Sequence, residues 1–432
     1  MKIAMIGHKA IPSTKGGIET VLTNICPIMA LNKTENQIKA EEKFEAKTEK
    51  TEENEKNEEN GKIKKNGKNK QNRENKKNKI QAKTEIVCYN RTSDKPEKEF
   101  EEYIINNEYK GVKLKKAPTV KIKGAAAMVA SFTAAIKASF SNCDIVHFHA
   151  EGPAAAMFIP KLFGKKCVST VHGLDWQRQK WGKGFGSKYI KFGEKMLVKY
   201  ADEVIVLSNG AKEYFKKAYG RETVVIPNGI SRPKILENNI TEKRFGLKKD
   251  GYICMVARLT EEKGVHYLIK AYNEINTNKK LVICGDTSDT DEYVKHLKDM
   301  AKNNKNIIFT GFVSGNTLAE IYSNAYLVCL PSDLEGMSVS LLEALSYGNA
   351  VLCSDIPENT DVCSDYAETF KKSDTEDLKN KLELLLNNYQ AVQKYKNRAA
   401  EYVLNRFSWE KTAEKTLAVY KKILKGAKAD VQ

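Results

Sequence analysis

Two glutamates separated by seven residues, Glu335 and Glu343, flank a stretch suited to bind a phosphorylated sugar. The apolar run 325–330 before them predicts a buried strand. Ser338 is a good N-cap type and Gly348 a good residue to follow a helix, so a helix is predicted between them. A strand, a glycine-containing turn and a helix aim backbone N–H groups and a positive helix end at one point, which suits a phosphate. Carboxylates repel phosphate, so both glutamates are better placed to accept hydrogen bonds from sugar hydroxyls. The residues alone leave open an ordinary strand–helix element with surface glutamates.

The frame from Glu335 to Gly348, E-G-M-S-V-S-L-L-E-A-L-S-Y-G, resembles the signature of retaining glycosyltransferases of family 4. The resemblance implies an α/β chain with the GT-B fold, in which two Rossmann-like domains face each other across a cleft and the C-terminal helix crosses back to the first domain. We expect an N-terminal acceptor-side domain at 1–230 and a C-terminal nucleotide-sugar-binding domain at 231–405. Residues 406–432 would form the crossing helix and tail.

Arg258 and Lys263 lie five residues apart in a predicted strand-to-helix loop. Arginine offers a planar fork and lysine a point charge, so both can bind one diphosphate. Their frame, R-x4-K-G, resembles the second signature of the family. By that resemblance they hold the donor diphosphate together with the backbone around Gly336, Met337, Ser338 and Val339. The same resemblance gives Glu343 the ribose hydroxyls and makes Glu335 catalytic, bound to the hydroxyls of the transferred sugar.

Gly16 and Gly17 precede a predicted helix, where paired glycines let backbone approach a ligand closely. A glycine pair alone is a weak signal. The frame P-x3-G-G-x-E around them resembles the first loop of the same family, which closes over the donor phosphates, so both are expected to bind donor.

His172 follows the predicted strand 167–171. Ligands gather at the carboxyl ends of parallel strands. The run 172–182 resembles the rhamnosyltransferase-like branch of surface-polysaccharide glycosyltransferases. It implies a catalytic His172 facing the donor sugar, with Asp175, Trp176 and Arg178 towards the acceptor. His147 and His149, in the strand before, are interpreted as mainly structural.

The formal net charge of +17 favours polyanionic partners. Between 178 and 199, lysines alternate with aromatic residues at helical spacing, as in helices that contact anionic membranes, although a packed helix with solvated lysines fits equally well. No run reaches the roughly 18 apolar residues of a spanning helix. The segment 33–83 is rich in Lys, Glu and Asn and is predicted to be a disordered insertion. Nine scattered cysteines are predicted to be buried free thiols in a reducing cytosol. A cytoplasmic protein is therefore expected, and the basic helix favours association with the inner face of the cell membrane.

The predicted reaction is sugar transfer from a UDP-, GDP- or dTDP-sugar to a glycan or lipid-linked acceptor. The resemblance implies retention, with the leaving phosphate deprotonating the incoming hydroxyl. No D-x-D motif stands at a strand end, because Asp289 and Asp291 fall at a predicted helix start where capping explains them. No metal and no cofactor are therefore expected. Two alternatives remain: a nucleotide-sugar epimerase on the same fold, and a non-catalytic basic binder of polyanions, although no nucleic-acid motif is present.

Overall fold

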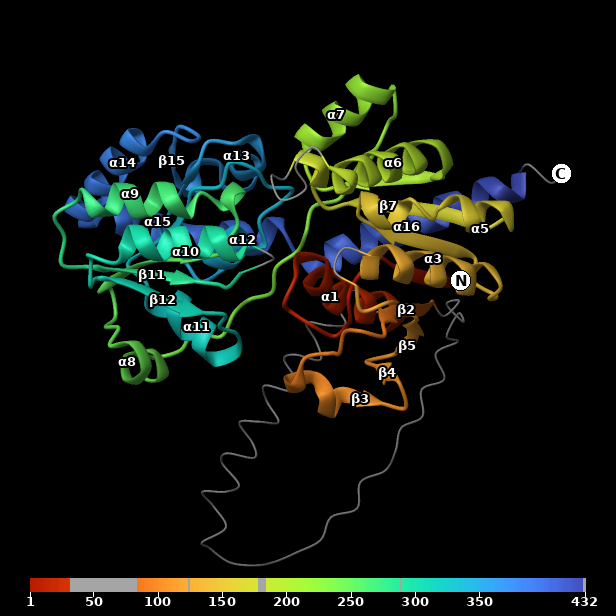
Figure 1. The fold of residues 1–432 in the computed structure, drawn as a ribbon, viewed down its shortest axis with the longest axis horizontal. Helices are drawn as coiled ribbons and strands as arrows, with labels where there is room; N and C mark the ends of the chain where they lie inside the picture. Colours follow the sequence, from red (N-terminus) through yellow and green to blue (C-terminus); the bar gives the residue numbers. More distant parts are fainter. Residues whose placement is uncertain (32–83, 123–124, 178–183, 288–289, 430–432) are drawn as a thin grey trace, which may run out of the picture.

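The structure is a computed structural model that describes residues 1–31, 84–122, 125–177, 184–287 and 290–429. The predicted insertion 33–83, the acceptor-side candidate Arg178 and Asp289 lie outside these residues. The described chain forms two α/β units side by side, joined by the segment after β9 and by the last helix (Figure 1).

The first unit is built on a sheet of nine strands in the order β3-β4-β5-β2-β1-β6-β7-β8-β9. All neighbours pair in parallel except the β3–β4–β5 hairpin strands. Its elements are β1 (Lys2–Ile6), α1 (Gly17–Leu31), β2 (Glu85–Arg91), β3 (Ile104–Ile105), β4 (Glu108–Tyr109), β5 (Val112–Ala117), α3 (Ala125–Ser139), β6 (Ile145–His149), α4 (Glu151–Ala154), α5 (Phe158–Leu162), β7 (Lys166–Val171), α6 (Phe185–Tyr200), β8 (Glu203–Val206), α7 (Asn209–Tyr219) and β9 (Val224–Val225).

The second unit contains an entirely parallel sheet of six strands in the order β12-β11-β10-β13-β14-β15. Its elements are α8 (Ile240–Phe245), β10 (Tyr252–Val256), α9 (Val265–Asn273), β11 (Lys280–Cys284), α10 (Asp291–Ala301), β12 (Ile307–Gly311), α11 (Gly315–Asn324), β13 (Leu327–Leu330), α12 (Val339–Ser346), β14 (Val351–Ser354), α13 (Pro357–Cys363), β15 (Glu368–Phe370), α14 (Thr375–Asn387) and α15 (Tyr389–Arg406).

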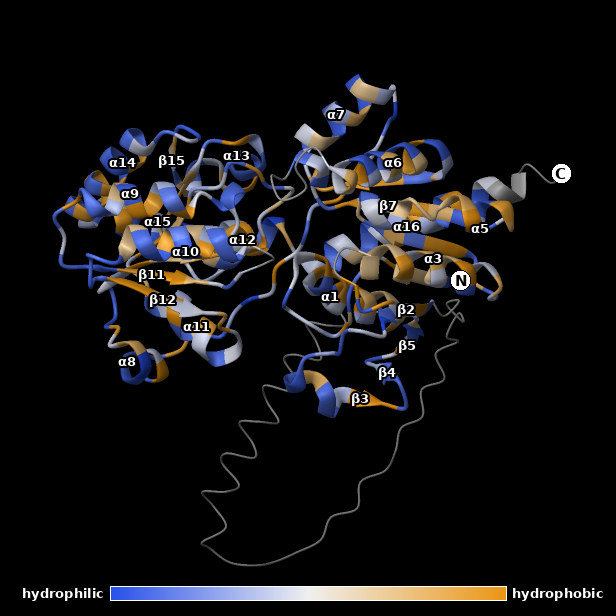
Figure 2. Ribbon diagram, in the orientation of Figure 1, coloured by the Kyte–Doolittle hydropathy of each residue, from blue (hydrophilic) through white to orange (hydrophobic). Residues whose placement is uncertain are grey.

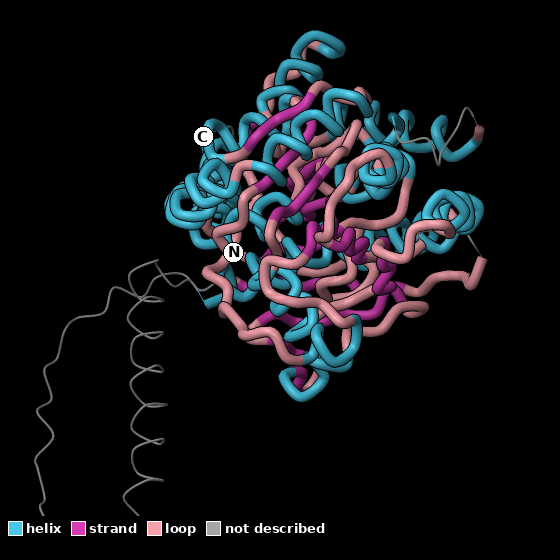
Figure 3. The backbone as a smooth tube through the Cα atoms, turned by 90° about the vertical axis from the view of Figure 1, so that its left-hand side faces the viewer, coloured by secondary structure: helices cyan, strands magenta, loops and turns pink. Residues whose placement is uncertain are grey.

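Each sheet is covered by helices on both faces, which is why its strands are nearly continuous apolar runs. From the side of the second unit, the strands run between helices (Figure 3). Figure 2 shows β11 and β12 mostly hydrophobic, whereas the visible face of α10 is mostly hydrophilic. All nine cysteines are free and buried, as predicted.

The last helix, α16 (Trp409–Ala429), returns to the first unit, as predicted. Trp409, Leu417 and Tyr420 are buried with side chains of β1 and α1 beneath the first sheet. Two Rossmann-like units and a crossing helix are thus present, while the boundaries at 230 and 405 stay predictions. Within the part of the chain that the structure describes, no helix is long and apolar enough to cross a membrane.

Candidate active site

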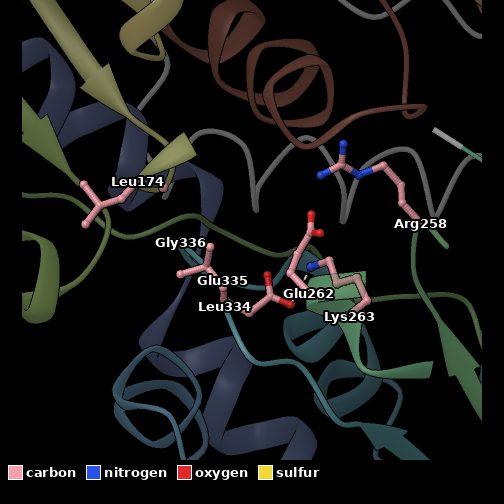
Figure 4. A pocket seen from close by; sticks show the side chains of 8 residues that line it. Leu174, Arg258, Glu262, Lys263, Leu334, Glu335 and Gly336 are labelled. Carbon is pink, nitrogen blue, oxygen red and sulfur yellow. Dashed lines mark hydrogen bonds and ion pairs between the residues drawn. The ribbon is translucent and has the colours of Figure 1, made fainter. Parts of the chain in front are cut away.

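A pocket lies where the loop after β7 meets two loops of the second unit (Figure 4). Leu174 lies on one side of it and Arg258 on the other. Four predicted site residues, Arg258, Lys263, Glu335 and Gly336, therefore come together. The complete lining is Gly173, Leu174, Arg258, Glu262, Lys263, Leu334, Glu335 and Gly336.

The loop after β10 places Arg258 and Lys263 at the carboxyl edge of the second sheet. Lys263 ends a short 3-10 helix and Gly264 follows it with φ +67°. A Cβ atom on Gly264 would lie 2.0 Å from the carbonyl oxygen of Pro331. Only glycine therefore fits, and it lets the loop after β10 pack directly against the loop after β13.

Lys263 forms an ion pair with Glu335, with 2.5 Å between Nζ and Oε1. The two side chains are only 15% and 8% exposed, so the pair is poorly screened by water. Ser332 Oγ donates to the same carboxylate oxygen at 2.8 Å, and Ser354 Oγ donates to the Ser332 carbonyl. Asn359 of α13 in turn donates to Ser354 Oγ. This series of hydrogen bonds thus connects Glu335 to β14 and α13.

Gly336 is one of the points at which the two units touch. A Cβ atom there would lie 1.8 Å from the carbonyl oxygen of His172 and 2.8 Å from Cα of Gly173. A side chain at 336 would force the loops apart. The glycine of the E-G frame therefore allows the two walls of the pocket to meet.

His172 lies beside a buried histidine rather than alone. His172 Nε2 and His149 Nδ1 are 3.0 Å apart. Burial, and secondarily the neighbouring His147 and His172, lower the pKa of His149 well below its usual range, so His149 is neutral at physiological pH. His147 is held by Tyr420 and Thr170, at 2.6 and 2.8 Å, and burial lowers its pKa to about 3.

The helix that follows Glu335 begins as predicted. Ser338 is the N-cap of α12, and its Oγ accepts from the N–H of Leu341. Met337 is buried, and its sulfur accepts from the N–H of Asn228, in the segment that joins the two units. Val339 is the first residue of α12. None of these three residues lines the pocket itself.

Glu343 lies one turn further along α12 and accepts a hydrogen bond from Tyr322 at 3.2 Å. Burial raises the pKa of Glu343 to about 7, and the hydrogen bond from Tyr322 partly offsets this effect. Glu343 does not line the pocket either.

The acceptor-side candidates Asp175 and Trp176 are held by buried carboxyl groups. The N–H of Asp175 donates to Glu151 at 3.2 Å, and the Trp176 ring N–H donates to Glu194 at 3.1 Å. Burial, with secondary repulsion from Asp175, raises the pKa of Glu151 well above its usual range. Lys191 lies over the Trp176 ring, 4.5 Å from its centroid.

Gly16 and Gly17 lie at the start of α1 and do not line the pocket. A Cβ atom on Gly16 would lie 2.1 Å from a carboxylate oxygen of Glu19. The adjacent Lys15 crosses to the second unit, where its Nζ is 5.7 Å from the centroid of the Phe312 ring. The first loop thus reaches the opposite unit through a lysine that was not predicted to take part.

Sequence reasoning missed two further contributors besides His149. Glu262 lines the pocket between Arg258 and Lys263, and Ser332 binds Glu335. The signal for Ser332 was its position three residues before Glu335, at the end of an apolar strand. Glu262 offered no distinguishing signal among the charged residues of its loop.

Two family models match this chain. The model described as Glycosyltransferase Family 4 matches residues 81–232, and the model described as Glycosyl transferases group 1 matches residues 238–402. The family 4 match supports the predicted resemblance at the level of the family. Neither match addresses the predicted rhamnosyltransferase-like branch.

Among curated proteins, the chain is 25% identical over 335 residues to the alpha-maltose-1-phosphate synthase of Mycolicibacterium smegmatis, covering 71% of this chain and 86% of that protein. It is 26% identical over 217 residues to the O-antigen chain mannosyltransferase RfbU of Salmonella typhimurium, covering 50% of this chain and 59% of that protein.

Among solved structures, sucrose-phosphate synthase from Thermosynechococcus elongatus superposes with a TM-score of 0.74 at 16% identity, covering 98% of this chain and 99% of that one. HepE from Anabaena in complex with UDP-glucose superposes with a TM-score of 0.70 at 13% identity, covering 98% and 100%. These likenesses confirm the predicted GT-B fold.

Proposed function

We propose that this chain, which has the GT-B fold and matches two glycosyltransferase family models, transfers a hexose from a nucleotide-diphosphate sugar to a glycan or lipid-linked acceptor, with retention at the anomeric carbon. The observation that carries the proposal is the meeting of Arg258, Lys263 and Glu335 in one pocket, closed by Gly336 against the first unit. Such a pocket offers cations for a diphosphate and a carboxylate for sugar hydroxyls.

In this proposal, Arg258 and Lys263 bind the diphosphate, supported by backbone N–H groups at Met337, Ser338 and Val339. Breaking the sugar–phosphate bond builds negative charge on the leaving oxygens, and fixed cations lower that barrier. Lys263 is already held by Glu335 at 2.5 Å, so its charge is preorganised and does not need to move far. These two cations would neutralise the leaving group without a metal ion.

The sugar would lie between the two walls. Glu335 accepts from its hydroxyls, and His172 faces it from the first unit. Glu343 takes the ribose hydroxyls, and the first loop at Gly16 and Gly17 closes over the phosphates. The leaving phosphate removes the proton of the incoming hydroxyl on the same face of the sugar, so no separate protein base is needed.

The donor and the acceptor are proposed by class. HepE was solved in complex with UDP-glucose, and RfbU is an O-antigen chain mannosyltransferase, which supports a nucleotide-sugar donor and a surface-polysaccharide acceptor for this chain. Within that class we propose a UDP-, GDP- or dTDP-sugar. The run 172–182 favours rhamnose-like sugars within that class. Asp175, Trp176 and Arg178 are proposed to line the acceptor side. The proposed place of the protein is the cytoplasm, at the inner face of the membrane.

Calorimetric titration with UDP, GDP and dTDP, each with and without EDTA, tests the proposal. We expect one nucleotide to bind in the micromolar range, unaffected by EDTA. Arg258→Ala should weaken binding by about tenfold to a hundredfold, because a charge-assisted hydrogen bond is lost. The matched control is Arg232→Ala, since Arg232 is exposed and paired with Glu401 at 2.8 Å outside the pocket.

The remaining outcomes would refute specific parts of the proposal. Binding that EDTA abolishes would refute the metal-free diphosphate site. No binding by any of the three nucleotides would refute the proposed donor class. Conversion of the nucleotide-sugar to its epimer without an acceptor would refute transfer and favour an epimerase.

A further inference from the structure

Large apolar side chains are exposed where α3 and α5 end. Phe140 is 73% exposed and Leu162 78%, and Ile136 and Phe163 are also exposed. The Phe140 and Phe163 rings contact each other edge to face, with centroids 4.7 Å apart. Exposed apolar groups scattered singly need no explanation, but a contiguous group of this size indicates a surface that meets another apolar phase.

The neighbouring helix α6 carries a mixed stripe on its outer side. Its exposed residues follow helical spacing and are Phe185, Lys188, Lys191, Phe192, Lys195 and Lys199. Its inward residues Ile190 and Leu197 are buried in the core. The single carboxylate of α6, Glu194, is also buried and accepts from the Trp176 ring N–H. The exposed side of α6 is therefore aromatic and basic, with no acidic group.

These three helices cover the same face of the first sheet, because their inward residues belong to one core cluster. Figure 1 shows α3, α5 and α6 side by side on the unit that contains the N-terminus. Neither α3 nor α5 contains an Asp or Glu. We call the outward side of these helices the α3–α5–α6 face, defined by Ile136, Phe140, Leu162, Phe163, Phe185, Phe192 and the exposed lysines of α6.

We propose that the α3–α5–α6 face docks on an anionic lipid bilayer. Phenylalanine and leucine side chains insert into the boundary between headgroups and acyl chains, while lysines of the same helix bind lipid phosphates. Lysine stems also lie along apolar surface while their ammonium groups stay in water. The charge of the face decides between occupants. A second copy of this chain would bring like charges together, whereas an anionic bilayer neutralises them.

The docking proposal rests on the lipid-linked acceptor of the proposed function, because such an acceptor lies in a membrane. The α6 helix follows the loop that places Gly173 and Leu174 in the pocket. The α6 stripe therefore extends from the side of the pocket to the opposite edge of the sheet, where α3 and α5 end. Vesicle binding needs neither donor nor acceptor, so the docking proposal and the transferase proposal fail independently.

The test is co-sedimentation of the full-length protein with vesicles of phosphatidylcholine alone or mixed with phosphatidylglycerol, at low and high salt. We expect binding only to the anionic vesicles. The double variant Lys188→Glu/Lys195→Glu should lower the partition coefficient by about tenfold or more, because two groups that bind lipid phosphates are replaced by groups that repel them. Phe140→Ser/Phe163→Ser should weaken the binding that persists at high salt.

Matched controls separate this face from the overall charge. Lys302→Glu/Lys305→Glu changes the net charge equally at exposed lysines of the second unit. Leu384→Ser/Tyr389→Ser removes two similarly exposed large side chains there. Both controls should retain most of the binding. Equal losses in the controls, equal binding to neutral vesicles, or no binding at all would overturn the proposal. So would self-association in sedimentation velocity that Phe140→Ser/Phe163→Ser abolishes, because it would assign the face to a second copy.

Discussion

The second-unit wall of the pocket is charged, with Lys263 paired to Glu335 beside Arg258, whereas the first-unit wall opposite places His172, backed by the neutral His149, behind the contact at Gly336. Charged groups fixed in a poorly screened site act strongly on a diphosphate. The neutral imidazole of His149 can hold His172 in place without adding a charge near the leaving group. The difference indicates that the second-unit wall stabilises the charge of the diphosphate, whereas the first-unit wall orients the sugar.

The largest expected effect comes from Glu335→Gln. Loss of a carboxylate that acts in the transition state should lower kcat by about a hundredfold to a thousandfold. Nucleotide affinity should stay the same or rise, because Lys263 loses the carboxylate that now shares its charge at 2.5 Å. Single-turnover kinetics and calorimetry measure the two quantities separately. Unchanged kcat would show that Glu335 takes no part in the proposed reaction, and the contrast between the two walls would no longer hold.

The second unit should also respond to pH, through Glu343 of α12 behind the pocket. Its pKa is raised from 4.5 to about 7 by burial, so the folded chain binds more protons at Glu343 than the unfolded chain between these values. The free energy of unfolding contributed by this group is therefore fully present below about pH 4.5 and is lost as pH rises to about 7. The loss amounts to at most about 3 kcal/mol.

Denaturant unfolding of wild type and Glu343→Gln across this range measures the effect. The difference between the two proteins should change with pH in the stated direction. The matched control is Glu237→Gln, at an exposed glutamate outside the pocket, which should follow wild type at every pH. A pH-independent difference for Glu343→Gln would contradict the raised pKa.

The next prediction concerns His149, behind the first-unit wall. Its Nε2 is buried and has no hydrogen-bond partner among the described residues. A proton there would be an unsatisfied donor, so we expect neutral His149 to carry its proton on Nδ1 and to donate it to Nε2 of His172, 3.0 Å away. His149 thus acts as a positioning residue for His172, and one lost hydrogen bond should lower kcat by roughly tenfold.

The pair His149→Phe and His149→Asn tests this role. Asparagine keeps an N–H near the position of Nδ1 and should restore part of kcat, whereas nucleotide affinity should not change in either variant. His147→Phe is the control, because His147 bonds Tyr420 and Thr170 and should affect thermal stability more than kcat. Equal losses of kcat in both His149 variants would contradict a role for the hydrogen bond at Nδ1.

The residues of the second-unit wall could be predicted from the sequence because they lie close together along the chain. Arg258, Lys263 and Gly264 share one loop, and Glu335 and Gly336 share another. Apolar runs and glycines at strand ends are local signals, and they also predicted most strands and helices of both sheets. The family frames then implied that the two loops meet, which the pocket confirms.

The first wall could not be predicted in the same way, because its contacts depend on strand register. In the sheet His149 pairs with Thr170, two residues before His172. No local pattern states which residues of β6 and β7 stand opposite each other. For this reason His172 was predicted as a site residue, while its partner His149 was interpreted as structural.

The smallest expected effect concerns Lys15, whose contact with the Phe312 ring links the two units. Its ammonium lies over the Phe312 ring of the second unit, and an exposed cation–π contact contributes about 0.5–1 kcal/mol. If this contact holds the first loop closed over the donor, Lys15→Ala should raise KM for the donor by about twofold to fivefold, with little change in kcat. Lys110→Ala is the matched control, because Lys110 lies 5.6 Å from the Tyr109 ring within the first unit. A change in kcat without a change in KM would place Lys15 in the chemistry, and the charged wall would then extend into the first unit.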